Sequence, residues 1–395
     1  MKKNLFFFLI SLLLPLSTLS KEHQFNHLRV IWHENPSKDA IIAWSGEKAK
    51  RGQLLKLTRQ EKRGNSTMTL SIRSQKVLGI KPYLHSVALN DLQPNSKYTF
   101  SISKNGSESR SFYFLTPPKE GKNFKLLFGG DSRSDREKRR EINASIKEYF
   151  TKNKDVMAIV HGGDFISNGY SWKQWDAWLE DYQMTILNDG RLLPIVPTRG
   201  NHEMRSNLFN KIFFWKKGLS MRSNYFVTRF GKLSLFTLNT NISHGGRQRA
   251  WLNRVLDEES KSQKWLVANY HRPAYPAVKK PGRAKKHWVP LFEKYGVDLV
   301  FESDGHTLKR TVPIFQEKRN DKKGIVYLGE GGLGVNLRKP KMKDKWYFKP
   351  PGYAKSAYHF FSLKVMEDKL KVDVLSPPSL EVLDNIVFHP RENRR

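Results

Sequence analysis

The stretch VMAIVHGGDF, residues 156–165, holds the pattern that decides the fold: a short apolar run followed at once by a polar turn containing Asp164. Four other apolar runs are followed in the same way by polar clusters. These clusters are GGDSRSD with Asp131, RGNHE with Asn201 and His202, NYHRP with His271, and DGHTL with His306. Apolar runs of this length are typical of buried strands in an α/β sheet. We therefore expect the polar side chains at the carboxyl ends of strands, where open α/β sheets bind their ligands.

Segments of helical periodicity alternate with these runs over the larger, C-terminal part of the chain. The expected strands are 124–128, 156–160, 192–196, 265–268 and 297–301, and the expected helices are 135–150, 172–187, 247–260 and 285–295. This alternation indicates βαβ units. Later runs of antiparallel character are 225–230, 233–238, 325–328, 357–363 and 370–374. Together they predict an α/β domain over 123–376, with two mixed sheets flanked by helices, and a C-terminal tail over 377–395.

The N-terminal residues 25–118 have a different pattern, with short alternating runs separated by Gly, Asn, Pro and Lys. This pattern predicts an all-β sandwich domain that precedes the α/β domain. The segment LQPNSKYTFSI, residues 92–102, resembles the fibronectin type III signature, in which Tyr98 would open the sixth strand and Trp44 would be the core tryptophan. We expect this module to be independent and to contribute no metal ligand, with Pro117 and Pro118 opening the linker.

The first twenty residues have the layout of a secretory signal peptide. Lys2 and Lys3 precede an apolar stretch over 5–16, and small residues follow before Lys21. We therefore expect a secreted or periplasmic protein with a signal peptide over 1–20 and no membrane span after its cleavage. The chain contains no cysteine, which excludes disulfides and thiolate metal sites.

The chain is strongly basic, with a formal net charge of +33 over 395 residues. The excess is spread along the whole chain, whereas nucleic-acid readers usually concentrate it on one face. A uniform excess still attracts phosphate esters and other polyanions. We therefore name a phosphate-ester substrate as the expected partner and leave polyanion contact through the basic surface open. The sequence indicates no oligomeric state.

The five clusters, in this order, resemble the motifs of the calcineurin-like metallophosphoesterases. With the preceding sandwich, the chain resembles bacterial purple acid phosphatases, whose motifs are GDxG, GDxxY, GNH[ED], a lone His and GHxH. The resemblance implies that Asp164 bridges two metal ions. It implies that Asn201, His271 and His306 complete the second site, and that Asp131 belongs to the first. The expected cofactor is one or two divalent or trivalent ions of the Fe, Mn or Zn class.

The chain departs from the family pattern at the first metal site. Ser167 stands at the tyrosine position of GDxxY, Leu308 at the last histidine position of GHxH, and Arg133 where related enzymes have the histidine of DxH. The first site therefore keeps two carboxylates of its expected ligands. The Arg133 guanidinium would lie where that metal would have been, carrying positive charge and forking onto two phosphate oxygens.

From these observations we expect a metal-dependent hydrolase of phosphate esters, acid phosphatase-like, in which a metal-activated water attacks phosphorus. We favour a phosphomonoesterase over a phosphodiesterase. His202 would donate a hydrogen bond to a phosphate oxygen or protonate the leaving group, and Arg133 would neutralise phosphoryl charge. The alternative is a phosphate- or polyanion-binding protein that retains one metal site and has lost turnover. A nuclease is a weaker third hypothesis, since it rests only on the basic surface.

Other residues near the motifs have structural as well as functional interpretations. We expect His161 to be a packed histidine, and leave open whether Glu203 orients a neighbour and whether His244 is an exposed loop residue. Asp304, before Gly305, could cap a turn as readily as bind metal. The basic segment 338–349 is either a solvated face or a loop that contacts a polyanionic substrate.

Overall fold

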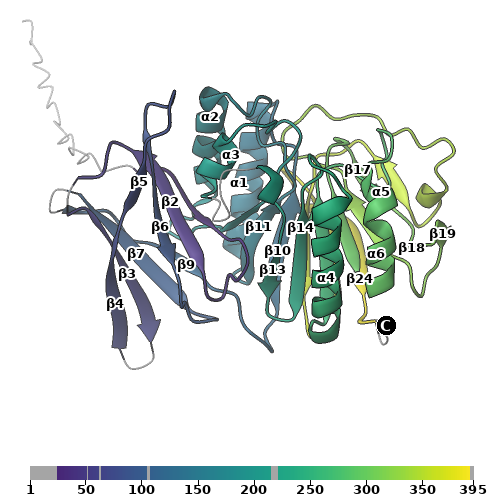
Figure 1. Cartoon of the computed structure of the whole chain (residues 1–395), viewed down its shortest axis with the longest axis horizontal. Coiled ribbons are helices and arrows are strands. Elements are labelled where there is room, and N and C mark those ends of the chain that lie inside the picture. Colours follow the sequence, from purple (N-terminus) through teal and green to yellow (C-terminus); the bar gives the residue numbers. More distant parts are fainter. Residues whose placement is uncertain (1–24, 51, 62–63, 105–106, 215–220, 392–395) are drawn as a thin grey trace, which may run out of the picture.

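The structure is a computed structural model that describes residues 25–391 except 51, 62–63, 105–106 and 215–220. The predicted signal peptide lies outside the described residues. In the C-terminal part, two β-sheets pack face to face and helices cover their outer faces, while the N-terminal strands form a β-sandwich to one side (Figure 1). The predicted fold class, an all-β sandwich followed by an α/β domain with two mixed sheets, is therefore confirmed.

The first sheet contains ten strands in the order β24-β23-β22-β10-β11-β12-β1-β2-β6-β5. Its bounds are β24 Glu381–Phe388, β23 Leu370–Ser376, β22 Phe360–Val365, β10 Phe124–Gly129, β11 Val156–His161, β12 Ile195–Pro197, β1 Asn26–Ile31, β2 Ala40–Gly46, β6 Tyr83–Leu89 and β5 Arg73–Gln75. The central strands β10, β11 and β12 are parallel. Their carboxyl ends therefore point the same way.

The second sheet contains seven strands in the order β13-β14-β15-β16-β20-β17-β21. Its bounds are β13 Phe226–Phe230, β14 Leu233–Leu238, β15 Trp265–Tyr270, β16 Leu299–Glu302, β20 Val326–Gly329, β17 Leu308–Arg310 and β21 Tyr353–Lys355. Strands β14, β15, β16 and β20 are parallel. A separate hairpin pairs β18 Ile314–Phe315 with β19 Lys318–Arg319.

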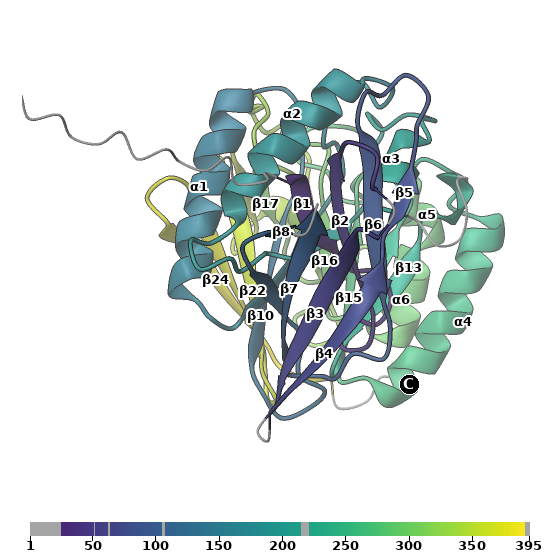
Figure 2. The ribbon, with the colours of Figure 1, turned by 90° about the vertical axis from the view of Figure 1, so that its left-hand side faces the viewer.

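Apolar side chains fill the space between the sheets and under the helices. Phe128 of β10 stacks on Phe301 of β16 with ring centroids 3.8 Å apart, so the two sheets are in direct contact. The helices are α1 Arg136–Lys152, α2 Trp172–Tyr182, α3 Leu208–Ile212, α4 Gly246–Ser262, α5 Ala284–His287 and α6 Val289–Tyr295. Figure 2 shows α1 and α2 on one side of the strands and α4 and α6 on the other. This four-layer packing holds the parallel strands rigidly beneath the loops at their carboxyl ends.

The N-terminal sandwich is hydrogen-bonded to the α/β part and is not a separate body. Its second sheet contains β3 Leu54–Glu61, β4 Gly64–Ser71, β7 Lys97–Lys104, β8 Ser107–Glu108 and β9 Phe112–Leu115. Its first sheet continues into the α/β domain, because β1 pairs in parallel with β12 through Ile31 and Ile195. We expected this module to be independent, but strands of the sandwich and of the α/β domain belong to one sheet. The domain boundaries and the fibronectin-like assignment stay predictions.

The C-terminal segment departs from the expected tail. Residues 381–388 form β24, which pairs antiparallel with β23 along its length and closes one edge of the first sheet. In the sequence EVLDNIVF, Ile386 is buried and Leu383 and Phe388 pack against the core, whereas Val382 and Val387 are exposed. Pro377 and Pro378 form the turn before this strand, and do not end the fold. No helix among the described residues is long and apolar enough to span a membrane.

Candidate metal centre

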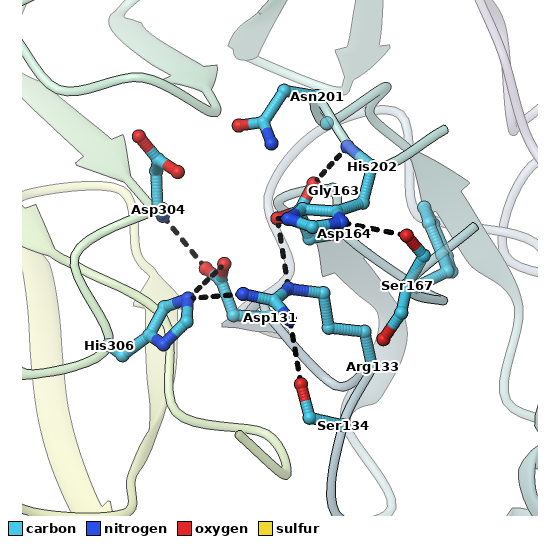
Figure 3. A network of polar contacts seen from close by, with 12 residues as sticks. Asp131, Arg133, Ser134, Gly163, Asp164, Ser167, Asn201, His202, Asp304 and His306 are labelled. Carbon is cyan, nitrogen blue, oxygen red and sulfur yellow. Dashed lines mark hydrogen bonds and ion pairs between the residues drawn. The ribbon is translucent and has the colours of Figure 1, made fainter. Parts of the chain in front are cut away.

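The loops that follow the predicted strands bring their polar residues together. Asp131 follows β10, Asp164 follows β11, Asn201 follows β12, His271 follows β15, and Asp304 and His306 follow β16. The Asp131 amide donates to the Gly163 carbonyl at 2.9 Å, and the Ser303 amide donates to the His271 carbonyl at 2.9 Å. These backbone bonds fix neighbouring loops relative to each other. Figure 3 shows the resulting cluster of side chains around Asp131, Arg133 and Asp164.

Backbone conformation places both aspartates where their side chains can meet. Asp131 and Asp164 have left-handed φ values of 57° and 56°, a region that aspartate tolerates better than most residues. Gly163 must be glycine, because its φ is +96° and a Cβ there would lie 2.5 Å from the Gly200 amide nitrogen. The loops after β11 and β12 can therefore approach this closely only with glycine at position 163.

Three side-chain oxygens surround the Nε2 atom of His271. Its Nδ1–H donates to the Gly162 carbonyl at 2.9 Å, which leaves the Nε2 lone pair available in the neutral ring. Nε2 lies 3.2 Å from Oδ1 of Asn201, 3.2 Å from Oδ1 of Asp164 and 3.5 Å from Oδ1 of Asp304. We call these four residues the His271 cluster. It places three side-chain oxygens within 3.5 Å of one imidazole nitrogen.

A guanidinium lies beside this point. Arg133 Nε is 3.3 Å from Oδ2 of Asp164, and an Nη2 hydrogen of Arg133 is directed at Nε2 of His306 at 3.3 Å. His306 Nε2 in turn lies 3.4 Å from Oδ1 of Asp131. We call Asp131, Arg133 and His306 the Arg133 cluster (Figure 3). In it the arginine supplies a fixed positive charge between the carboxylates.

His306 and Asp304 contact different halves of the site. We expected His306 to join Asp164, Asn201 and His271. The structure places it 3.4 Å from Asp131 and 3.3 Å from Arg133, and places Asp304 3.5 Å from His271. Asp304 and His306 both have left-handed φ values, 70° and 59°, so one tight turn directs both side chains into the site. Leu308, which we expected at a ligand position, is fully buried at the start of β17. Whether His306 binds metal stays a prediction.

Two buried carboxylate oxygens indicate that the site fits a cation. Asp131 Oδ1 and Asp164 Oδ2 are buried without a hydrogen bond, and the groups that face them, His306 Nε2 and Arg133 Nε, lie 3.4 and 3.3 Å away. A buried carboxylate oxygen is better stabilised by a cation at closer range. Ligand atoms of Asp131, Asp164 and His271 lie within 4.8 Å of one another. Carboxylate, amide and imidazole donors suit a first-row transition metal or zinc. The residues therefore fit the metal that the sequence predicts.

The pKa values of His271 and Asp304 also indicate that positive charge is stabilised in this cluster. Burial alone would lower the pKa of His271, but the charge and hydrogen bond of Asp164, with Asp304 and Asp131 nearby, hold it well above its usual range. Burial opposes ionisation of Asp304, but hydrogen bonding and charge from His271, with Lys279, lower its pKa to about 2. Without a metal ion, His271 itself would carry the positive charge that the carboxylates attract.

Two residues of the RGNHE motif support the site. Glu203 is fully buried and accepts hydrogen bonds from the backbone amides of Asp164, Phe165 and Gly200 at 3.0, 2.9 and 2.6 Å. Burial, followed by the Asp164 charge, raises the pKa of Glu203 to about 7. His202 Nδ1–H donates to the Ser167 carbonyl at 2.8 Å, while Nε2 lies 3.8 Å from Asp164 Oδ2. Glu203 therefore orients the loops, and His202 presents Nε2 to the site.

His161, His244 and the basic segment 338–349 are partly or fully buried beside the site. His161 is a packed histidine, as expected: it stacks on Phe165, and burial lowers its pKa to about 3. His244 is buried, with a pKa lowered to about 4 mainly by burial, so the exposed-loop interpretation is wrong. In the basic segment, Tyr347 and Phe348 are buried, and the Arg338 amide donates to the His306 carbonyl at 2.9 Å. This segment therefore braces the turn that carries His306.

Comparison with protein families and relatives gives one consistent result. Residues 91–310 match the model of the calcineurin-like phosphoesterases. The chain is 26% identical over 331 residues to acid phosphatase type 7 of Mus musculus, covering 71% of this chain and 72% of that protein. It is 25% identical over 328 residues to probable inactive purple acid phosphatase 27 of Arabidopsis thaliana, covering 67% of this chain and 51% of that one. The chain thus spans about half the length of this plant relative.

Solved structures share the fold at low sequence identity. A purple acid phosphatase from seeds of yellow lupin, Lupinus luteus, superposes with a TM-score of 0.75 and 16% identity, covering 93% of this chain and 75% of that one. PhoD superposes with a TM-score of 0.64 and 10% identity, covering 93% of this chain and 90% of that one. Both matches extend over nearly the whole chain, including the N-terminal sandwich.

Proposed function

Because the chain belongs to the calcineurin-like phosphoesterase family, it is a metal-dependent phosphoesterase, and we propose that it hydrolyses phosphomonoesters with one bound metal ion and one arginine. The observation that carries this proposal is the position of Arg133, with Nε 3.3 Å from Asp164 and Nη2 3.3 Å from His306. A second cation beside this guanidinium would be repelled at close range. One metal ion and one guanidinium would then share the task of neutralising the phosphoryl group.

The His271 cluster would hold the metal ion. Its donors are Oδ1 of Asp164, Asn201 and Asp304 and Nε2 of His271. An ion of the Fe, Mn or Zn class suits this nitrogen and oxygen set, and when bound it would supply Lewis acidity and lower the pKa of a water molecule. The Gly162 carbonyl keeps the His271 ring oriented by accepting its Nδ1–H. These contacts make the cluster the better formed half of the site.

Arg133 and His202 would act on the phosphate itself. The guanidinium has planar N–H donors that match two phosphate oxygens. Its positive charge stabilises the phosphoryl group more strongly as that group becomes more negative in the transition state. The Ser167 carbonyl fixes Nδ1 of His202 as a donor, so Nε2 faces the site. A protonated His202 would give its Nε2 proton to the leaving-group oxygen.

Release of phosphate from p-nitrophenyl phosphate tests this proposal. The protein is purified without chelators and assayed beside Asp164→Asn, which keeps the shape of the side chain but removes its charge. We expect turnover by the wild type, and a kcat/KM lower by on the order of 10³-fold in Asp164→Asn. Bis(p-nitrophenyl) phosphate separates a monoesterase from a diesterase: we expect a higher kcat/KM for the mono-ester. A reversed preference would assign the site to diesters.

The second candidate function is binding without turnover. The replacement of metal ligands by Arg133 and Ser167 favours it, and a plant relative is itself named probable inactive. A protein of this kind would bind inorganic phosphate with its metal ion and release no phosphate from any ester. Calorimetric titration with inorganic phosphate beside the p-nitrophenyl phosphate assay separates the two candidates.

We also propose export to the periplasm or the exterior, on the layout of residues 1–20 alone. Fractionation of cells that express the full chain tests it. Mature protein that begins after Ser20 in the exported fraction is the expected result. Recovery of the full-length chain only inside the cell would contradict it.

A further inference from the structure

A large basic cavity opens directly beside the His271 cluster. Its volume is about 930 Å³, and its lining includes Asn201 and Asp304 of that cluster. Loops from separate parts of the chain supply the cationic lining residues, which are Arg205, Arg272, Lys279, Lys280 and Arg283. The cavity is large enough for a drug-sized ligand. A molecule bound with its phosphate at the metal centre would therefore have its remainder in this cavity.

Most of this positive charge is uncompensated. Asp304 is the acidic residue of the lining, and Lys279 pairs with it at 2.5 Å. Across the described part of the chain, no carboxylate pairs with the side chains of Arg205, Arg272, Lys280 or Arg283. By contrast, exposed Arg254 on α4 pairs with Glu258 at 2.7 Å. Unpaired cations gathered around one concave surface create a potential that attracts anions.

A buried histidine forms part of the cavity wall. His244 lines the wall and is 5% exposed, and its Nε2 has no hydrogen-bond partner. Its ring is held by stacking on Trp288 at a centroid distance of 4.5 Å. The stacked rings therefore make this part of the wall rigid, beside the charged residues that line the rest of the cavity.

We propose that this cavity binds a second phosphate group of the substrate, so that the preferred substrates are small bisphosphorylated esters. The inference rests on the proposed function, because it takes the scissile phosphate to lie at the metal centre. Lys280 and Arg283 lie on the segment before α5, are exposed, and are free to pair with a second dianion. Charge-assisted contacts to phosphate are among the stronger polar interactions, so the second group should raise affinity at least about tenfold.

A kinetic comparison tests this substrate class. We would measure kcat/KM for fructose 1,6-bisphosphate and for fructose 6-phosphate with the wild type and with Lys280→Gln/Arg283→Gln. The matched control is Lys154→Gln/Lys322→Gln, which removes the same charge from exposed lysines that precede β11 and β20, at the opposite ends of the strands. We expect a bisphosphate preference of at least about tenfold in the wild type and control. Loss of that preference in the cavity variant alone is the supporting result.

Binding without turnover gives an independent measurement. Propane-1,3-bisphosphonate and propylphosphonate cannot be hydrolysed as esters, and calorimetric titration of the metal-loaded protein gives both dissociation constants. Tighter binding of the bisphosphonate, reduced in the cavity variant and kept in the control, supports the inference even if no ester is hydrolysed. Equal constants in the wild type, or a preference that survives Lys280→Gln/Arg283→Gln, would overturn it. Absence of phosphate release with this binding pattern would overturn the proposed function instead.

Discussion

The two halves of the candidate metal centre solve the same electrostatic problem differently. In the His271 cluster, three side-chain oxygens lie within 3.5 Å of one imidazole nitrogen, a donor set that suits a metal ion. In the Arg133 cluster, the chain itself supplies the cation, because Nε of Arg133 lies 3.3 Å from the shared Asp164. A fixed guanidinium can supply the positive charge of a metal ion, although it cannot act as a Lewis acid. The chemistry should therefore depend on the His271 half and the phosphate affinity on both.

Removal of the shared carboxylate should have the largest effect, because Asp164 belongs to the first half and contacts the second. We expect Asp164→Asn to lower kcat/KM on an aryl phosphate by on the order of 10³-fold and to release the bound metal ion. Steady-state kinetics and metal analysis of the same sample measure both. Activity within tenfold of the wild type would show that Asp164 does not join the two halves.

Arg133→Ala should come next, with kcat/KM about 10²-fold lower, because a preorganised charge on the phosphoryl group is lost. Arg133→Lys is the matched control: it keeps the charge without the planar fork, so we expect partial recovery. Arg133→His should go further and raise the bound metal toward about two per chain, since imidazole is a ligand and removes the repelling charge. Unchanged kinetics in all three variants would remove Arg133 from the mechanism.

Substitution of His271 and of His306 distinguishes the His271 cluster from the Arg133 cluster. His271→Ala should empty the metal site, whereas His306→Ala should keep the metal ion and lower kcat/KM only about tenfold, through loss of orientation around Arg133. Metal content after gel filtration gives the comparison directly. If His306→Ala lost the metal ion as completely as His271→Ala, His306 would belong to the His271 half after all, as the sequence had suggested.

A smaller effect concerns stability and contrasts two buried histidines. His271 has a raised pKa, whereas burial lowers the pKa of His359 to about 4. Because the unfolded chain binds the proton more tightly, the contribution of His359 is complete above pH 6.5 and declines as the pH falls toward 4. At pH 5.5 this costs about 1 kcal/mol of the free energy of unfolding. Urea denaturation at pH 7 and 5.5 should show this loss in the wild type and a smaller one in His359→Gln.

The sequence predicted the strands and helices that hold the site, because hydrophobic periodicity is a local signal. The strand β11 and the helix α2 begin at the predicted residues, Val156 and Trp172. Non-local pairing was not visible. The contact of β1 with β12 joins residues 31 and 195, which no local pattern encodes. For β24, the β-branched and aromatic residues of EVLDNIVF favour a strand, although Pro377 and Pro378 precede it.

Within the site, the motifs identified the loops correctly, but the identity of one ligand position depended on backbone conformation. In SDGHTL, only the left-handed φ values of Asp304 and His306 decide that these two residues, and not His306 and Leu308, face the centre. The apolar Leu308 followed by Lys309 and Arg310 was a signal for a strand with its side chain in the core. The basic cavity could not be predicted, since separate loops build it.

Metal content tests most directly whether the site holds one metal ion beside Arg133. The wild-type protein, purified without chelators and passed through gel filtration, is analysed for Fe, Mn and Zn by mass spectrometry beside His271→Ala and Arg133→His. If the His271 cluster holds the ion and Arg133 repels a second one, we expect about one tightly bound ion in the wild type. We expect none in His271→Ala and a rise toward about two in Arg133→His. Two tightly bound ions in the unmodified protein would contradict this expectation, because Arg133 could not then occupy the position of the second metal.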